Sequence, residues 1–564
     1  MEKTESYLPI VRALEVLMRR ALDLKVKKED PYGAIRTFKI SGIRIVYMRQ
    51  QYYQQPYLNA VPGRLESYKS APELLITLFY EGKEKKVNCP LSIKNSYLQT
   101  FNGILSSTWP RLSSAISELL DEFYGSTLKD QKIYKEYQVK EPPRMKDEEF
   151  VLPTLERIPE KFSVDFETLL RDIFLTECIA QVDAHVCSTR KVWIVLDSHG
   201  TRIIQKQDIM RISIVPYAVG DKKRLYLGSI YQMEKSFEKI RNEFPNFKKQ
   251  FQEFLYSINR KQLPSGIYPL IFEPSATATL FHEAIAGHML SGAYIVDETS
   301  TIFKGKLGKS VSTDMFMPIL KKLQISDCPL DDDMLATYRY DMEGVPAKNV
   351  LLINKGVLKN YLLDRNSAAR MGKEDNGHAL AEDFQQNAII SFFEDNDGPR
   401  LPEPRVSNLK VISDSKTTFK DLEDAYFHKY GYYILVKSYA GEVNVSTGTF
   451  ELHVDYLTKV YPDGKKEYFH GGTFSSNMTD FVNAIKDVSN KYGITSGYCG
   501  SDSGWVPTQE YTPATSVYGI NWAPVALPEP IKMYNLKRDK YIPKNWEKTE
   551  SYEFPSNLNA KDEK

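Results

Sequence analysis

The sequence predicts an α+β fold in two parts: an N-terminal domain of mixed helix and antiparallel sheet, and a C-terminal, mostly antiparallel β domain. Two observations favour this division. Up to about residue 260, segments with the 3.6-residue periodicity of amphipathic helices alternate with short apolar strands. Beyond that point, short strands separated by turn residues predominate, and a short helix carrying several polar side chains comes near their start.

The N-terminal part is expected to contain four helical segments and several strands. Helices are expected where apolar residues recur every three or four positions, and proline is expected to interrupt two of them. The predicted helices are 8–24, 91–124 with a break at Trp109-Pro110, 166–183, and 235–259 with a kink at Pro245. The predicted strands are a pair within 34–48 around Ser41-Gly42, then 191–196, 201–205 and 212–218. The polar stretch 129–146 is expected to be an exposed connection.

The C-terminal part is expected to be mostly strands. A hairpin is predicted over 350–363, with Gly356 at the turn position that requires a positive φ. Further strands are predicted at 406–412, 432–437, 447–460 and 466–471, and helices at 414–429 and 477–492. The proline- and glycine-containing stretch 261–266 marks a boundary. The predicted domains are therefore 1–262, 263–525 and a C-terminal tail, 526–564.

Composition and charge exclude several classes of protein. The 564 residues carry a net charge of +1, so no basic footprint for nucleic acid is evident. The longest apolar runs are far shorter than a membrane span, and the N-terminus has no signal-peptide pattern. The five cysteines are scattered and odd in number, which argues against a disulfide framework and fits a reducing compartment. We expect a cytoplasmic protein with no nucleic-acid or membrane partner.

The chemically distinctive stretch is 281–290, in which His282, Glu283 and His288 lie within seven residues. Imidazoles are neutral nitrogen ligands for zinc, and a neighbouring carboxylate can accept a proton from water that the metal activates. Ser275 is expected to N-cap a helix that begins at Ala276. The alternative is an ordinary buried helix whose histidines are hydrogen-bonded core residues.

The spacing of the two histidines constrains the local backbone. Residues six apart are separated by about 240° around a regular α-helix, so His282 and His288 cannot both face one ion on it. The helix must therefore end, unwind or bulge between Ala284 and His288. Gly287 is the residue best able to allow this, and an inserted residue in a π-bulge would have the same effect.

Four further motifs follow in the second half: 338–347 (YRYDMEGVPA), 350–365 (VLLINKGVLKNYLLDR), 404–408 (PRVSN) and 497–507 (GYCGSDSGWVP). Together with the histidine motif, they resemble the TldD/PmbA family of metallopeptidases, on its catalytic, TldD-like side. The resemblance covers about residues 267–522. It implies a zinc site formed by His282, His288 and Cys499, with Glu283 as the catalytic carboxylate. The spacing here, HExxxxH, is one residue longer than the HExxxH of the family.

The resemblance also implies the protein's activity and partners. We expect a zinc-dependent peptidase that acts on short or unfolded peptides, either as a homodimer or as a heterodimer with a PmbA-like subunit, the N-terminal domain helping to pair subunits and enclose the cleft. Two alternatives remain open: a non-catalytic family subunit acting as scaffold or modulator of a peptidase partner, and a structural zinc protein. Candidate substrate contacts are Arg405, Ser407, Asn408 and His378, while Asp341, Glu343 and Arg365 fit a salt bridge that holds a loop.

Overall fold

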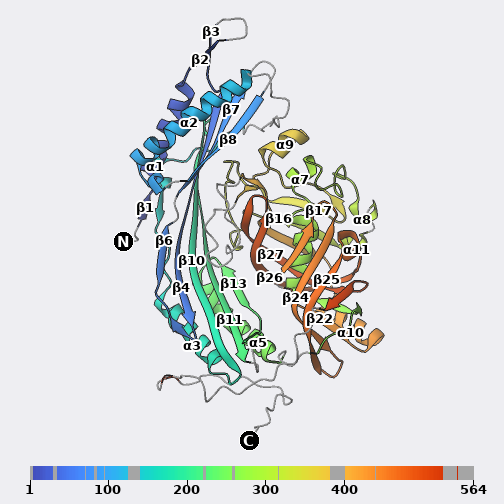
Figure 1. Cartoon of the computed structure of the whole chain (residues 1–564). Helices are drawn as coiled ribbons and strands as arrows, with labels where there is room; N and C mark the ends of the chain where they lie inside the picture. Colours follow the sequence, from blue (N-terminus) through green and yellow to red (C-terminus); the bar gives the residue numbers. More distant parts are fainter. Residues whose placement is uncertain are drawn as a thin grey trace.

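The computed structural model shows two large β-sheets lying side by side, one in each half of the chain (Figure 1). It describes residues 4–29, 35–69, 72–81, 86–94, 96–124, 140–219, 224–256, 261–314, 317–381, 401–438 and 440–524, together with 543 and 546. The α+β fold class predicted from the sequence is confirmed.

The N-terminal sheet is antiparallel and is built around three long neighbouring strands, in the order β11–β10–β4. Its strands are β4 (Gly42–Leu58), β7 (Glu73–Glu81), β8 (Lys86–Lys94), β10 (Ile179–Asp197), β11 (Arg202–Val219) and β12 (Arg224–Tyr226). The short strands β5 (Val61–Pro62) and β6 (Glu66–Lys69) pair with β4, and β13 (Ile230–Glu234) pairs with β11. Two small ribbons add β1 (Thr4–Ser6) with β9 (Val151–Pro153), and β2 (Val26–Glu29) with β3 (Ile35–Phe38).

The two faces of this sheet belong to different hydrophobic cores. Because successive side chains in a strand point to opposite faces, Ile194 of β10 packs under the N-terminal helices while Trp193 and Val195 join the core of the C-terminal half. The helices on the first face are α1 (Leu8–Asp23) and α2 (Phe101–Tyr124); a separate cluster includes α3 (Glu160–Phe174), α4 (Phe237–Asn242) and α5 (Phe244–Tyr256). Burial on both faces explains the continuous apolar run 192–196 near the end of β10.

The C-terminal sheet has thirteen described strands and is mostly antiparallel, with parallel pairing only at β15–β22 and β21–β27 among them. In spatial order its strands are β14 (Gly266–Ile267), β28 (Asn521–Pro524), β25 (Lys466–Asn477), β24 (Thr449–Val460), β22 (Tyr433–Val436), β15 (Leu270–Phe272), β27 (Gly504–Val517), β21 (Asn408–Ser413), β16 (Leu323–Asp327), β17 (Val350–Asn354) and β18 (Val357–Leu358). Two more strands, β23 (Ala440–Asn444) and β26 (Ile485–Ser501), pair with β24 and β27.

Short helices connect these strands. They are α6 (Pro274–Phe281), η3 (His282–Ala286), α7 (Gly292–Val296), α8 (Val311–Asp314), η4 (Pro318–Lys322), α9 (Arg365–Met371), α10 (Phe419–Tyr430) and α11 (Met478–Asn483). The strands β19 (Ala379–Leu380) and β20 (Glu403–Pro404) form a separate small ribbon. The predicted hairpin is confirmed as β17–β18, with Gly356 at φ +81°.

Three helix predictions were partly wrong, each because a strand replaces part of the helix. Residues 91–94 belong to β8, and α2 then runs through Pro110 because its apolar face is buried, as at Ile104, Leu112 and Ile116. The helix predicted at 166–183 is α3 and ends at Phe174. The helix predicted at 477–492 lasts only to Asn483, where β26 follows almost at once.

Other predictions hold or fall outside the described residues. Helix 8–24 is confirmed as α1, and the predicted kink near Pro245 is the break at Glu243 between α4 and α5. The strands predicted at 201–205 and 212–218 are one continuous strand, β11. Most of 129–146 and of the tail 526–564 lies outside the described residues, and the three-part domain division stays a prediction.

Two buried ion pairs join the halves of the chain. Arg44 of β4 lies 3.2 Å from Glu343, and Arg365 of α9 lies 3.3 Å from Asp197 at the end of β10. All four side chains are less than a tenth exposed. Arg365 and the loop containing Glu343 are therefore held against central strands of the N-terminal sheet, through partners, Asp197 and Arg44, that the sequence analysis did not name.

Replacing Asp197 by Asn should destabilise the protein by about 3–5 kcal/mol, because the charge of the buried Arg365 then loses its partner. Urea denaturation followed by tryptophan fluorescence measures the change. The matched control is Asp414→Asn, which breaks the exposed pair with Lys355 and should leave the unfolding midpoint unchanged. Equal effects of the two variants would contradict the structural importance of the buried pair.

Candidate metal centre

The histidine motif is carried by α6, which rises directly from strand β15. The helix begins at Pro274, with Glu273 rather than Ser275 as its N-cap residue, because proline's fixed φ suits the first helical position. Two hydrogen bonds fasten it to β27: the hydroxyl of Thr277 lies 3.0 Å from that of Thr515, and Thr512 donates to the carbonyl of Pro274. The start of the motif is therefore fixed to the sheet.

The predicted irregularity in the helix is present. Residues His282–Ala286 form a π-helical turn, in which the amide of Gly287 donates to the carbonyl of His282 at 2.7 Å. The chain then leaves the helix in a turn before His288. A π-turn takes up one more residue than an α-turn, so the extra residue of the HExxxxH spacing is absorbed here.

Gly287 is required by close packing against His282. A Cβ atom at this position would lie 2.8 Å from the carbonyl oxygen of His282 and 2.9 Å from Cδ2 and Nε2 of its imidazole. All three separations are shorter than ordinary contacts of a Cβ atom. Because glycine has no side chain, the backbone passes over the imidazole and brings His288 back beside it.

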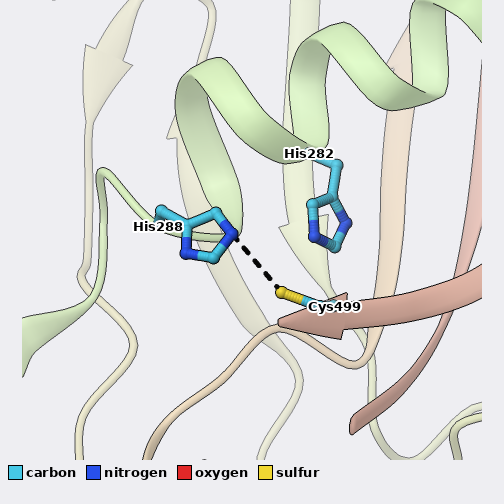
Figure 2. A group of neighbouring side chains, drawn as sticks. All are labelled: His282, His288 and Cys499. Carbon is cyan, nitrogen blue, oxygen red and sulfur yellow. Dashed lines mark hydrogen bonds between the residues drawn. The ribbon is translucent and has the colours of Figure 1, made fainter. Parts of the chain in front are cut away.

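The third side chain comes from strand β26. Cys499 pairs with Val506 of β27 and is buried below the histidine turn. Its Sγ lies 3.5 Å from Nε2 of His288, and the rings of His288 and His282 are 6.0 Å apart (Figure 2). One ligand atom from each of the three residues lies within 4.8 Å of the other two. The structure thus brings together the three side chains singled out in the sequence, from segments more than 200 residues apart.

A carboxylate orients His282. Oε1 of Glu510, on β27, lies 2.8 Å from Nδ1 of His282, and both side chains are buried. A carboxylate only accepts, so Nδ1 carries a proton, and Nε2 presents its lone pair when the ring is neutral, as a metal ligand must be. That Nε2 atom is buried and has no hydrogen-bond partner. An unpartnered lone pair in this position, with a carboxylate behind the ring, is the arrangement of a metal-ligating histidine.

The three side chains perturb one another's charge. Burial raises the pKa of the Cys499 thiol, but Arg405 and the two imidazoles outweigh it and hold this pKa well below its usual range. Burial lowers the pKa of His288, but the Cys499 thiolate and Glu283 raise it to about 9. Burial likewise opposes the charged form of His282, and Cys499 and Glu510 raise its pKa well above the ordinary value. The site favours a thiolate, the form of cysteine that binds metals.

Arg405 holds the strand end that carries Cys499. Its guanidinium donates to the backbone carbonyl of Cys499, and also to Ser503 Oγ and the carbonyl of Gly504, both at 2.7 Å. Arg405 is 1% exposed, so it cannot reach a substrate. The prediction that it contacts substrate was wrong; its cation fixes the β26–β27 turn and stabilises the nearby thiolate.

The site opens into a cleft of about 480 Å³. Glu283 lies at its edge beside the histidines, with Oε2 3.3 Å from Nε2 of His288. Two segments line the cleft, residues 440–443 of β23 and residues 495–498 and 500 of β26, and Tyr231 reaches it from β13 of the N-terminal sheet. The cleft is therefore lined by Glu283 and by two candidate ligands, His282 and His288, and Cys499 is buried beside His288.

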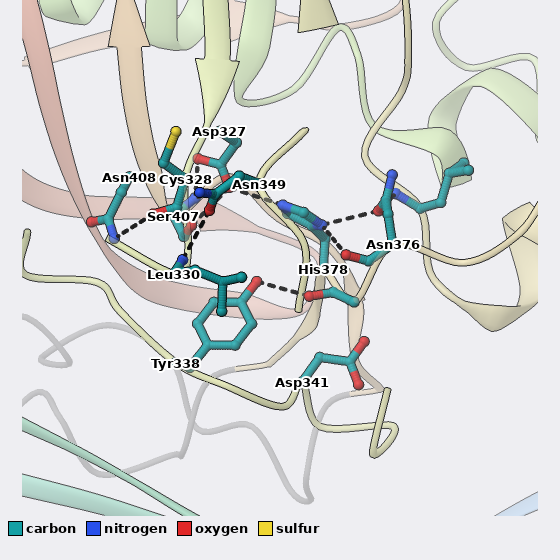
Figure 3. Close-up of polar contacts among 12 residues, drawn as sticks. Asp327, Cys328, Leu330, Tyr338, Asp341, Asn349, Asn376, His378, Ser407 and Asn408 are labelled. Atoms are coloured by element: carbon teal, nitrogen blue, oxygen red, sulfur yellow. Dashed lines mark hydrogen bonds and ion pairs between the residues drawn. The ribbon is translucent and has the colours of Figure 1, made fainter. Parts of the chain in front are cut away.

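The remaining candidates from the sequence form a buried network away from this cleft. Nε2 of His378 lies 3.0 Å from Asp327, which also accepts from the hydroxyl and amide of Ser407 (Figure 3). The side chain of Asn408 accepts a hydrogen bond from the amide of Ala336 and donates one to the carbonyl of Cys328. His378, Ser407 and Asn408 are completely buried, which contradicts a substrate-contact role for them. These groups shape the loops around the sheet.

Sequence reasoning missed Glu510 and Tyr231. Glu510 lies in β27 and Tyr231 in β13, but nothing in the sequence around them indicates that Glu510 contacts His282 or that Tyr231 reaches the other half of the chain.

Two imidazole nitrogens and one thiolate form a donor set that suits zinc and leaves room for a fourth ligand. The orphaned Nε2 of His282 and the second carboxylate behind it fit such an ion.

The C-terminal half of the chain is similar to known metallopeptidases. The family model described as "PmbA/TldA metallopeptidase C-terminal domain" matches residues 265–523. A metalloprotease of Methanocaldococcus jannaschii is 28% identical over 273 residues, which are 48% of this chain and 54% of that protein. A zinc metalloprotease TldD homologue of Saccharolobus solfataricus is 28% identical over 239 residues, 42% of this chain and 46% of that protein. The chain thus spans about half the length of these relatives.

The fold likeness extends beyond the residues that the family model matches. The structure of TldE from Thermococcus kodakarensis superposes with a TM-score of 0.61, covering 91% of this chain and all of that one, at 16% sequence identity. At this identity the likeness concerns the fold, including the N-terminal half that the family model does not match. In the part of the chain that the structure describes, no helix is long and apolar enough to cross a membrane.

Gly287→Ala should abolish tight zinc binding, because the new methyl group would overlap the imidazole and carbonyl of His282. Metal analysis of the purified variant, with circular dichroism to verify folding, measures the loss. The matched control is Gly497→Ala on β26, where an added Cβ meets nothing within 4 Å. Full zinc occupancy in Gly287→Ala would show that the close approach is not needed.

Proposed function

Since the chain belongs to the TldD/PmbA family of metallopeptidases through residues 265–523, we propose that it is a zinc-dependent peptidase that hydrolyses peptide bonds in short or unfolded peptides. The observation that carries this proposal is the convergence of His282, His288 and Cys499 at a cleft, with a lone pair of His282 that no protein group satisfies. A buried thiolate and two imidazoles have no comparable purpose in an ordinary core.

The roles of the side chains follow from their positions. Zinc held by His282, His288 and Cys499 would supply Lewis acidity and make a water molecule more acidic. Glu283, at the edge of the cleft, would accept a proton from that water and deliver it to the leaving amine. Glu510 would keep the ring of His282 in the tautomer and orientation needed for binding. Arg405 would hold the segment of Cys499 in place.

The cleft offers main-chain groups to an extended substrate. Among the described strands, β23 pairs only with β24 and β26 only with β27, so each presents one edge without a strand partner. Residues of both edges line the cleft. An added peptide strand pairs through backbone groups, which gives register without requiring a particular sequence. Gly441 of β23 packs closely against the helix, where a Cβ would meet Glu283 Cγ at 3.3 Å, so a peptide paired along this edge would lie beside the proposed catalytic carboxylate.

Pairing with a second subunit is part of the proposal. The fold of this chain matches the solved structure of a TldE over its whole length, which supports association with a PmbA-like subunit or with a second copy. The N-terminal sheet would then help to pair the subunits and wall the cleft, to which it already contributes Tyr231. The cytoplasm is the compartment that suits an unpaired, metal-binding thiolate such as Cys499.

Glu283→Gln should retain zinc and lose hydrolysis by about 10²–10⁴-fold, because the amide cannot accept the proton. Zinc content and turnover of a disordered peptide, measured on the same preparation, separate binding from chemistry. The control Glu298→Gln, at an exposed position outside the cleft, should turn over normally. Near-normal turnover by zinc-loaded Glu283→Gln would assign the proton transfer to another group.

Cleavage should be confined to flexible chains and should stop when a chelator removes the metal. A disordered polypeptide should be cut, whereas a stable folded domain should resist because local unfolding must come first. Gel and mass analysis of both substrates, with and without chelator and with a PmbA-like subunit added, makes the comparison. Cutting that a chelator does not affect would refute the metallopeptidase, and zinc-loaded protein without activity under every condition would favour the scaffold or modulator role.

A further inference from the structure

A second group of possible ligands lies outside the cleft, among the loops that meet the N-terminal sheet. Asp341, Glu343 and Asp375 each place one carboxylate oxygen within 4.8 Å of the other two. Their exposed fractions are 0%, 6% and 1%. Unlike the three residues of the cleft, these offer only oxygen. The group, here called the buried carboxylate cluster, has no role in the proposed hydrolysis.

Negative charge exceeds positive charge around the cluster. Two further buried carboxylates lie nearby: Asp364, which raises the pKa of Asp375, and Asp197, the ion-pair partner of Arg365. Among the described residues, the guanidinium groups that pair with this set are those of Arg44 and Arg365. Two guanidinium groups thus pair with this set of five buried carboxylates, and the ammonium of Lys348, 3.2 Å from the backbone carbonyl of Asp375, belongs to a half-exposed side chain. An uncompensated buried charge is costly, so this excess requires either protons or a cation.

One carboxylate oxygen of the cluster is unsatisfied. Oδ1 of Asp375 accepts the amide of Gly377 at 2.8 Å, whereas its Oδ2 is buried and has no hydrogen-bond partner. The other two carboxylates are firmly positioned: Asp341 accepts the amides of Glu343, Val345 and Ala379, and Glu343 accepts from the amide of Arg365 and from Arg44. A buried oxygen of this kind is expected to have a ligand or a proton.

The pKa shifts also indicate that ionisation of all the carboxylates in the cluster is unfavourable when no cation is bound. Burial, and then the charges of Asp341 and Glu343, raise the pKa of Asp375 well above its usual range. Burial and Glu343 also raise the pKa values of Asp341 and Asp364. Neighbouring carboxylates in a low-dielectric site remain charged together only when a cation lies between them.

We propose that Asp341, Glu343 and Asp375 bind a hard divalent cation, calcium, at a site separate from the zinc centre. Calcium takes oxygen ligands at about 2.3–2.6 Å in flexible geometry, so oxygens on opposite sides of one ion lie up to about 5 Å apart. The observed separations fit this limit. Magnesium fits less well, because it requires near-octahedral geometry with shorter bonds and keeps several waters, for which a buried site has little room.

The bound cation would act on the structure rather than on the reaction. Its three ligands come from the loop after Tyr340 and from the segment between α9 and β19, and Glu343 is paired with Arg44 of the N-terminal sheet. Calcium would therefore join two loops of the C-terminal half at the contact between the halves. The expected consequence is calcium-dependent stability that is independent of zinc.

Terbium(III), which replaces calcium at oxygen sites, tests the site directly. The indole of Trp193 donates to the backbone carbonyl of Asp341 at 3.2 Å, so terbium bound at the cluster should be sensitised by tryptophan excitation. In the full-length, zinc-loaded protein, we expect terbium luminescence that calcium displaces with a stoichiometry of one. Trp193→Phe should lose most of this luminescence while calcium binding by calorimetry persists.

Variants then separate the two metal sites. Asp375→Asn should lose terbium and calcium binding by at least 10-fold and keep zinc, and Cys499→Ala should lose zinc and keep calcium. The matched control is Glu442→Gln, from the exposed group Glu442, Glu451 and His453, which should leave terbium binding unchanged. Calcium at about 100 times its Kd should raise the melting temperature of the unmodified protein by about 2–5 °C and that of Asp375→Asn not at all.

Three results would overturn the proposal. They are a melting temperature unaffected by calcium, terbium luminescence that survives Asp375→Asn, and terbium luminescence that Glu442→Gln abolishes. The first would mean that protons alone compensate the cluster, and the others would place the cation elsewhere. If Asp375→Asn does not fold, the displacement experiment and the Trp193→Phe comparison on folded protein still decide between these outcomes.

Discussion

The candidate metal centre depends on one contact, the passage of the Gly287 backbone across the imidazole of His282. A regular helix would place His288 about 240° from His282, on the far side of its axis. The π-turn over His282–Ala286 absorbs the extra residue, and the turn that follows carries His288 back to within 6.0 Å, ring to ring. That path is open only because position 287 has no side chain to collide with the ring. The unusual motif spacing and the glycine are therefore one structural feature, not two.

The sheet supplies two side chains of the site that the helix does not carry, Cys499 and Glu510. Strands β26 and β27 pair in a register that puts Cys499 opposite Val506 and Glu510 opposite Thr495, so a thiol and a carboxylate both meet the histidine turn. A slip of β26 by one residue against β27 would turn Cys499 to the other face of the sheet, away from the face on which Glu510 lies. Arg405 donates to the carbonyls of Cys499 and Gly504, and this holds the β26–β27 turn in place. The thiolate, its electrostatic support and the orienting carboxylate thus all depend on the pairing of these two strands.

What the sequence could predict follows from the range of the interactions involved. Periodicity and turn chemistry are local, so α1, the β17–β18 hairpin and the helical irregularity at Gly287 were accessible. The start of β26 contains register shifts between Ile485 and Asp487 and between Val488 and Tyr492, which interrupt the two-residue alternation of a strand, and this part was taken for a helix. Pairings between distant segments leave no local trace: Glu510 with His282, and His378 with Asp327, could not be found from their neighbours in the chain.

The two halves of the chain also depend on each other for their packing. In β10, side chains alternate between a core under the N-terminal helices and the core of the C-terminal half, so neither half is fully packed alone. The same strand carries Trp193, whose indole donates a hydrogen bond to the carbonyl of Asp341, and Asp197, which forms an ion pair with Arg365. The N-terminal sheet contributes Tyr231 to the cleft through β13, where the amide and carbonyl of Met233 bond to the hydroxyl of Ser496 on β26. Because Ser496 lies three residues before Cys499 on that strand, a change in the contact between the halves would move the edge of the cleft and a candidate metal ligand together. The N-terminal half is therefore a structural part of the site, although it contains none of the candidate ligands.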